Sequence, residues 1–215
     1  MIRILLLDDH TVVRTGYRRL IDAECDLQVV AEAATADEAY HCLQQGGIDV
    51  AVVDLSLRNG SGVEAIRRML ARDPGLKVLV LSMHDNAGFV TQAMRAGALG
   101  YLTKNSEPVE MLDGIRAVAA GRRILSADVA QGLTSATLDG DQILNRLTPR
   151  EFEVLRMAAT GEPSALIASQ MHLSHKTILN HLSMIRQKLD AENDFKLVRL
   201  AARHGLVDFT AEAYC

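Results

Sequence analysis

Short apolar runs alternate with amphipathic stretches along the first 120 residues of the chain. The runs cover residues 2–7, 27–31, 50–53, 77–81 and 98–102, and helix patterns lie near 11–23, 36–45, 62–72, 86–96 and 107–120. Five successive strand–helix units predict a parallel sheet with helices on both faces. The runs are continuously apolar, as expected for strands buried on both sides. Residues 1–120 therefore predict a doubly wound α/β domain with a five-stranded parallel sheet.

From Leu147 onward the chain shows only helix patterns. In "LTPREF", Thr148 is expected as N-cap, Pro149 at the first helical position and Glu151 as the partner that completes a capping box. Further helices are expected near 163–171, 175–189 and 194–204, with Gly205 ending the last one. Residues 145–210 thus predict a small all-α domain of four helices. Residues 121–144 are interpreted as a linker that contains one short helix.

Polar residues stand where the predicted strands end. Asp8 and Asp9 follow the first strand, Asp54 ends the third, Ser82 ends the fourth and Lys104 follows the fifth. The carboxyl ends of parallel strands share one edge of the sheet, so these side chains are expected to converge there. Three carboxylates repel one another unless a hard cation holds them, and Mg²⁺ is the natural candidate. The edge would suit a phosphoryl group built on Asp54.

Charge is divided unevenly along a chain whose formal net charge is −4. Residues 1–120 hold 12 Lys/Arg and 16 Asp/Glu, whereas residues 145–215 hold 9 and 8. The C-terminal part is therefore only mildly basic, which weakens a purely electrostatic argument for nucleic-acid binding. No apolar run approaches the roughly 20 residues of a membrane span, and no signal peptide is recognisable. With Cys25, Cys42 and Cys215 interpreted as reduced thiols, we expect a cytoplasmic protein without membrane contact.

Four segments of the first part, "LLLDDH", "VVDLSLRNGSG", "VLSMH" and "GYLTK", resemble the receiver domains of bacterial two-component response regulators. The resemblance implies that Asp54 is the phosphoacceptor and takes its phosphoryl group from a histidine of a sensor kinase. It also implies that Asp9, Asp54 and the backbone carbonyl of Ser56 bind Mg²⁺ directly, with Asp8 acting through water.

The same resemblance assigns roles around the phosphate. Lys104 would pair with it, Ser82 would move to hydrogen-bond it, and Tyr101 would change rotamer in response. Many relatives carry proline at the positions of Arg58 and Asn105, and in the second case the proline follows a cis peptide bond. A cis bond before a residue other than proline costs about 2.5–4 kcal/mol, so the local geometry at Asn105 stays open.

The segment from Leu147 to Asp208 resembles the LuxR-type helix-turn-helix, with the motif at about 164–183. Both parts together resemble the NarL/FixJ-like class of response regulators. The helix near 163–171 would brace the DNA backbone while the helix near 175–189 enters the major groove. Ser174 is expected to cap this recognition helix and to direct its backbone N–H groups at a DNA phosphate. The residues expected to face DNA are His175, Lys176, Leu179, Asn180 and Ser183, with Thr177 and His181 in phosphate-binding or supporting roles.

The function implied is that of a transcription regulator that forms a homodimer and binds promoter DNA when phosphorylated. Leu179, Leu182 and Met184 occupy positions where relatives usually carry Lys or Arg. They indicate either a changed base preference, with Leu179 on thymine methyls and Asn180 on adenine, or a C-terminal domain that contacts a protein partner instead. The last helix fits dimerisation and core packing equally well.

An enzymatic function is also conceivable, because some phosphatases pass through an aspartyl phosphate. Phosphatases of the haloacid dehalogenase type carry a second Asp two residues after the nucleophile, where this chain has Ser56. We therefore expect no substrate turnover beyond self-dephosphorylation. A regulator that ignores phosphorylation is the remaining alternative, although every group needed for phosphorylation is present.

Overall fold

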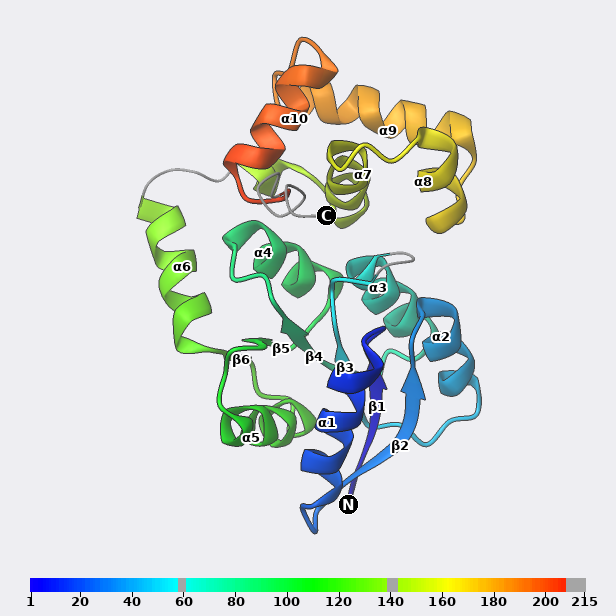
Figure 1. Ribbon diagram of the computed structural model, residues 1–215, viewed down its shortest axis with the longest axis vertical. Helices are drawn as coiled ribbons and strands as arrows, with labels where there is room; N and C mark the ends of the chain where they lie inside the picture. The colour runs from blue at the N-terminus through cyan, green and yellow to red at the C-terminus, as the bar shows by residue number, and fades with distance from the viewer. Residues whose placement is uncertain (58–60, 139–142, 208–215) are drawn as a thin grey trace.

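The computed structural model describes residues 1–57, 61–138 and 143–207. The N-terminal part is a parallel sheet in the order β2-β1-β3-β4-β5-β6, with helices on both faces (Figure 1). Its strands are β1 (Ile2–Leu7), β2 (Leu27–Ala33), β3 (Val50–Val53), β4 (Lys77–Ser82), β5 (Gly100–Thr103) and β6 (Ile124–Leu125). Its helices are α1 (Thr11–Asp22), α2 (Ala36–Gln44), α3 (Gly62–Arg72), α4 (Ala87–Ala96) and α5 (Pro108–Ala119). The doubly wound parallel fold predicted from the sequence is confirmed.

The sheet is buried on both faces. On one face, Leu6, Val52 and Leu81 pack against residues of α1 and α5, such as Ile21 and Ile115. On the other face, apolar strand residues pack against α2, α3 and α4. Continuous apolar strands are the sequence signature of this burial, because every side chain of a central strand meets a helix layer.

The sheet has one strand more than predicted. The short strand β6 pairs in parallel with β5, within the stretch that the sequence analysis assigned to the linker. The amide of Ile124 donates to the carbonyl of Leu99 over 3.2 Å, and the amide of Ser126 donates to the carbonyl of Tyr101 over 3.1 Å. Pairing satisfies backbone groups of β5 that would otherwise form an open edge. Two residues are too short a run to show a strand pattern.

The C-terminal part contains helices joined by short turns and no strand among its described residues. It follows α6 (Ala127–Leu138) and comprises the 3₁₀ turn η1 (Ile143–Arg146), α7 (Pro149–Ala159), α8 (Ser164–Gln170), α9 (His175–Lys188) and α10 (Asp194–Arg203). The predicted capping box is present at α7, where Thr148 and Glu151 each accept a hydrogen bond from the other's backbone amide. Lys188, at the end of α9, also pairs with Glu151 over 2.6 Å. None of the helices in the described ranges is long and apolar enough to cross a bilayer.

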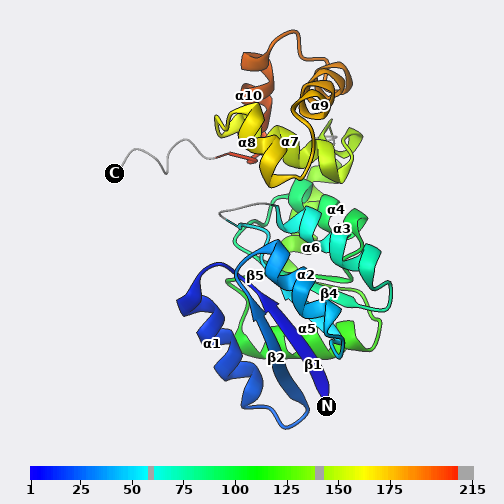
Figure 2. The same ribbon diagram turned by 90° about the vertical axis from the view of Figure 1, so that its right-hand side faces the viewer.

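The two parts pack directly on each other through α3 and α4 on one side and η1 and α7 on the other (Figures 1 and 2). The Gln92 side chain donates to the carbonyl of Leu147 over 3.1 Å. Arg150 of α7 pairs with the buried Glu64 of α3 over 3.2 Å. Buried apolar residues of both parts form one continuous cluster. This contact was not predicted, because the sequence patterns describe each part separately.

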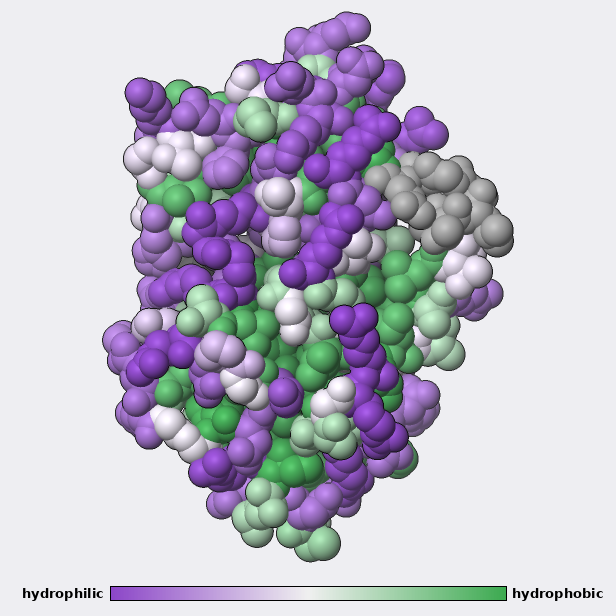
Figure 3. All heavy atoms as spheres, turned by 180° about the vertical axis from the view of Figure 1, so that it is seen from behind, coloured by the Kyte–Doolittle hydropathy of each residue, from purple (hydrophilic) through white to green (hydrophobic). Residues whose placement is uncertain are grey.

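Seen from behind, the surface differs between the two parts of the molecule. The upper part, which is the C-terminal helical domain, is mostly hydrophilic, whereas apolar residues gather in the middle of this face (Figure 3).

Gly62 offers a test of how tightly the loop after β3 is packed. A Cβ atom at this position would lie 2.4 Å from Leu55 Cα and 2.5 Å from the carbonyl oxygen of Asp54. We expect Gly62→Ala to lower the free energy of unfolding by about 1–3 kcal/mol, because backbone atoms must move. Gly16→Ala is the matched control, since that Cβ would meet no atom within 4 Å. It lies inside α1 and should raise stability by about 0.5–1 kcal/mol. Equal stability of both variants in urea unfolding would contradict this packing.

Candidate functional site

Asp54 lies at the carboxyl end of β3 and is only 2% exposed. Its backbone amide donates to the carbonyl of Leu7 over 2.8 Å, which continues the pairing of β3 with β1. One carboxylate oxygen, Oδ1, accepts from the backbone amide of Ser56 over 3.0 Å. The other oxygen, Oδ2, lies 2.7 Å from the Lys104 ammonium. Both oxygens are thus held by donors from two different loops.

Lys104 links two strand ends that are far apart in the sequence. Its Nζ lies 2.8 Å from Asp8 Oδ2 as well as 2.7 Å from Asp54 Oδ2. Burial opposes the charge of the ammonium, but the hydrogen bonds that it donates to Asp54 and Asp8 outweigh this effect and raise the pKa of Lys104. The lysine therefore stays charged at neutral pH and compensates two carboxylates at once.

The predicted acidic residues do converge, and a histidine joins them. One ligand atom each from Asp8, Asp9, His10 and Asp54 lie within 4.8 Å of one another. His10 Nδ1 lies 3.0 Å from Asp9 Oδ1 and 3.4 Å from Asp8 Oδ1. His10 was not predicted as part of the site, although it directly follows the two aspartates in the sequence. The donors at this edge are mainly hard carboxylate oxygens, which suit a small divalent cation.

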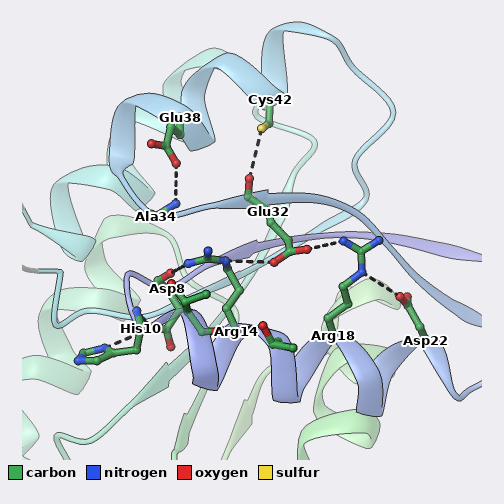
Figure 4. Close-up of polar contacts among 11 residues, drawn as sticks. Asp8, His10, Arg14, Arg18, Asp22, Glu32, Ala34, Glu38 and Cys42 are labelled. Carbon is green, nitrogen blue, oxygen red and sulfur yellow. Dashed lines mark hydrogen bonds and ion pairs between the residues drawn. The ribbon is translucent and has the colours of Figure 1, made fainter.

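Arg14, which the sequence analysis did not single out, supports this cluster from α1 (Figure 4). Its guanidinium donates to the backbone carbonyl of Asp8 and to Glu32 Oε2, the latter over 3.1 Å. Arg18, one turn further along the helix, also pairs with Glu32. The loop that carries the first acidic residues is thereby fastened to α1 and β2. The sequence offers one signal for this role of Arg14, which is its position one turn into the helix that follows the two aspartates.

Ser82 ends β4 and Tyr101 lies in β5, and both are 0% exposed. Ser82 Oγ accepts from the backbone amide of His84 over 3.1 Å, and the Tyr101 hydroxyl donates to the carbonyl of His84 over 2.7 Å. Burial raises the pKa of Tyr101, so its hydroxyl stays protonated and able to donate. His84 connects the two predicted phosphate-responsive residues. The rotamer change of Tyr101 stays a prediction.

The sequence analysis noted two departures from the receiver pattern, at Asn105 and at Arg58. Asn105 follows a trans peptide bond, since the described residues contain no cis bond. Arg58 lies outside the described residues. The bond geometry that the sequence left open at Asn105 is thus trans, and the preceding Lys104 keeps its contacts with Asp8 and Asp54.

The helix-turn-helix is formed by α8 and α9. Ser174 caps α9 as predicted, by accepting from the Thr177 amide over 3.1 Å. Ile178 and Ile185 are buried, so the opposite side of α9 faces outward. The predicted DNA-facing residues His175, Lys176, Leu179, Asn180 and Ser183 are exposed together with Ser174, whereas Thr177 and His181 are half-buried. This exposed surface is available to a large partner such as a duplex.

One residue of α9 differs from expectation. Leu182 was grouped with the outward-facing apolar residues, but it is half-buried and packs against the apolar cluster beside Leu155 and Leu197. That grouping was wrong for Leu182, because its position on α9 faces α7 and α10. His175, which is exposed as predicted, forms a hydrogen bond between its ring nitrogen Nε2 and Ser164 Oγ over 2.7 Å. This bond links the start of α9 to the start of α8.

Comparisons with known proteins agree with this architecture. Residues 4–116 match the family described as "Response regulator receiver domain". Residues 145–201 match "Bacterial regulatory proteins, luxR family". Among curated relatives, Response regulator UvrY of Escherichia coli is 32% identical, over 96% of either chain. Response regulator GacA of Pseudomonas aeruginosa is 35% identical, over 97% of this chain and 99% of the relative.

The chain belongs to the LuxR-type response regulators. It is a two-component regulator that joins a receiver domain to a DNA-binding domain and acts on transcription. A solved structure of RcsB from Salmonella enterica serovar Typhimurium, bound to promoter DNA with the phosphomimetic BeF₃⁻, is 26% identical. The structural match covers 94% of this chain and 98% of the RcsB chain, with a TM-score of 0.74.

Lys104→Met tests whether the shared ammonium holds the site of this response regulator together. Its loss leaves Asp8 and Asp54 facing each other without a counter-charge, so we expect a loss of about 3 kcal/mol in the free energy of unfolding. Because the pKa of Lys104 is raised on folding above its ordinary 10.5, its contribution should be complete at about pH 8 and fall only as the pH rises through the raised pKa.

The control for this prediction is Lys196→Met, which removes an ammonium 3.7 Å from Glu192 on the surface of α10. Surface pairs are worth about 0–1 kcal/mol, so this variant should behave nearly as the wild type. Urea unfolding at several pH values measures both variants. An equal, pH-independent loss in the two would contradict the structural role of Lys104.

Proposed function

We propose that Asp54 is the phosphoacceptor and that its phosphorylation controls promoter binding by a homodimer. The observation that carries the proposal is the convergence of Asp54, Lys104 and the Asp8–Asp9 pair at one edge of the sheet. Asp54 is buried, and its carboxylate is held by the Ser56 amide and the Lys104 ammonium. A structural aspartate at a strand end needs only to cap a helix or close a turn. The domain boundaries proposed for this function are 1–120 for the receiver, 121–144 for the linker and 145–210 for the DNA-binding domain.

In the proposed transfer, a carboxylate oxygen of Asp54 attacks the phosphorus of a phosphohistidine on the sensor kinase. The P–N bond breaks, an O–P bond forms, and the departing imidazole takes up a proton. Lys104 stabilises the negative charge that builds up on the phosphoryl oxygens. Ser82 supplies a hydroxyl donor for one of these oxygens after its bond to the His84 amide is released. The phosphoryl group is later lost to water, without turnover of another substrate.

Mg²⁺ is the cation proposed for the acidic cluster. Asp9, Asp54 and the carbonyl of Ser56 would hold it directly, and Asp8 would act through water. The fit rests on the donor set, because the ligand atoms of Asp8, Asp9 and Asp54 lie within 4.8 Å of one another and carboxylates suit this hard cation. When bound, it would neutralise charge on the phosphoryl group. The protein would carry out these reactions in the cytoplasm.

DNA binding is proposed for the outward side of α9, through the residues exposed there. Leu179 is 48% exposed and Asn180 lies beside it, so both are free to approach base edges. The receiver packs on α7 and η1 and also reaches His172 before α9 and His204 after α10, whereas the DNA-facing residues of α9 are exposed. Phosphorylation therefore does not need to uncover α9, and a change in how two copies pair or are oriented is favoured over domain separation.

Asp54→Ala tests the phosphoacceptor directly. With a small phosphoramidate donor and Mg²⁺, the wild type should gain one phosphoryl group by intact-mass spectrometry and bind promoter DNA more tightly. We expect Asp54→Ala to show neither change. Asp73→Ala, at the end of α3, is the matched control and should behave as the wild type, while a chelator should abolish the wild-type response. Phosphoryl uptake and tighter DNA binding by Asp54→Ala would overturn the assignment.

Asn180 and Lys176 are predicted to contribute differently to DNA binding. Asn180→Ala should cost about 1–3 kcal/mol on the preferred sequence and relax selectivity at one base pair, because an amide can pair with a base edge. Lys176→Ala should weaken binding to all sequences about equally and reduce the salt dependence, because it removes a phosphate contact. Titration of several duplexes at several salt concentrations measures both. A uniform loss for Asn180→Ala would exclude base recognition by this residue.

A further inference from the structure

The segment between β4 and α4 touches both the phosphorylation site and the DNA-binding domain. At one end, the backbone of His84 is held by Ser82 Oγ over 3.1 Å and by the Tyr101 hydroxyl over 2.7 Å. At the other end, the Asn86 side chain caps α4 and donates to the carbonyl of His204, just after α10. A shift of this segment would therefore change contacts in both domains.

The side chain of His84 begins a column of three aromatic rings. The imidazole stacks on the Phe89 ring with centroids 4.1 Å apart and an interplanar angle of 4°. Phe89 in turn meets Phe152 of α7 edge-on, with centroids 5.2 Å apart and an angle of 84°. Phe89 and Phe152 are 2% and 0% exposed. Close-packed interiors transmit displacement, so neither ring can shift without moving the other.

A cavity beside this column leaves room for His84 to move. It is lined by the loop residues Leu55, Ser56 and Leu57, by His84 and Phe89, and by Arg156 of α7. Arg156 is occupied by Glu153 over 3.0 Å, on the same helix. The loop that follows Asp54 and the helix that begins the DNA-binding domain thus face the same space around the imidazole.

Burial and the charge of Arg156 lower the pKa of His84, against smaller opposing effects of Asp54, Glu153 and Asp85. The imidazole is accordingly neutral at physiological pH. A neutral ring stacks on Phe89 without the need to bury a charge.

We propose that His84 is the positioning residue that transmits the phosphorylation state of Asp54 to the DNA-binding domain. The inference rests on the proposed phosphorylation of Asp54. When the Ser82 hydroxyl turns to a phosphoryl oxygen, it gives up the His84 amide, and the His84 backbone is free to move. The stacked imidazole carries that movement to Phe89 and then to Phe152. The orientation of α7, and with it the helix-turn-helix, follows.

The test compares His84→Ala and His84→Phe in the full-length protein. Phosphoryl uptake from phosphoramidate with Mg²⁺ is measured by intact mass, and promoter affinity is measured with and without the donor. His84→Phe keeps a flat ring on Phe89, whereas His84→Ala removes it. His41→Ala is the matched control, because this exposed histidine on α2 forms its hydrogen bond with Gln44 of the same helix and lies outside the aromatic column. Thermal unfolding verifies that each variant is folded.

We expect all variants to take up the phosphoryl group. The wild type, His84→Phe and His41→Ala should then bind DNA more tightly, by about 5- to 150-fold as is usual for coupled sites. In His84→Ala the donor should change DNA affinity by a factor close to one.

Three outcomes would overturn the proposal while leaving the proposed function intact. A full increase in His84→Ala would mean that the ring is not needed. An unresponsive but phosphorylated His84→Phe would mean that stacking does not carry the signal. Loss of phosphoryl uptake in His84→Ala alone would place His84 in the transfer chemistry instead. Failure of the wild type to take up a phosphoryl group would contradict the proposed function itself, and the transmission with it.

Discussion

The ammonium group of Lys104 holds together the carboxyl-terminal edge of the sheet, where the candidate functional site lies. Lys104 lies within 2.8 Å of carboxylates from two strand ends, Asp8 after β1 and Asp54 after β3. Because β5 is separated from both by β4 in the sheet, these contacts span the middle of the domain. Buried like charges are unfavourable without such compensation. Asp54 can therefore be almost fully buried, because the Lys104 ammonium compensates its carboxylate. Arg14 of α1 also stabilises this edge, because its guanidinium links the backbone of Asp8 to Glu32 of β2.

The second constraint is the shared apolar core of the two domains. Phe152 of α7 is buried against Phe89 of α4, and Arg150 and Gln92 add polar contacts across the same boundary. The first helix of the DNA-binding domain is thus built partly on the receiver. The recognition helix α9 is not covered by this arrangement, since Leu179 and its neighbours remain exposed. A receiver that packs against α7 influences where α9 points, and orientation determines whether two copies can reach neighbouring half-sites of DNA.

Much of this architecture could be predicted from the sequence, for physical reasons that differ by element. Five strands were found because central parallel strands are apolar throughout, and α7 was found because Thr148 and Glu151 form a capping box. The acidic site was foreseen because parallel strands bring their ends to one edge. Strand β6 was missed because two residues carry no periodicity, and Leu182 was misassigned because its packing partners lie on other helices. His84, Arg14 and the contact of Phe89 with Phe152 could not be predicted, since no local pattern indicates which loop meets which helix.

The most direct measurement of the central claim is selection of bound sequences from a random duplex pool, with and without a small phosphodonor and Mg²⁺. If phosphorylation of the receiver controls a dimeric DNA-binding protein, an inverted repeat should be enriched only when the donor is present. Enrichment that is equal in the two conditions would contradict control by phosphorylation. Absence of enrichment in both would contradict sequence-specific DNA binding and would favour a protein partner for Leu179 and Met184.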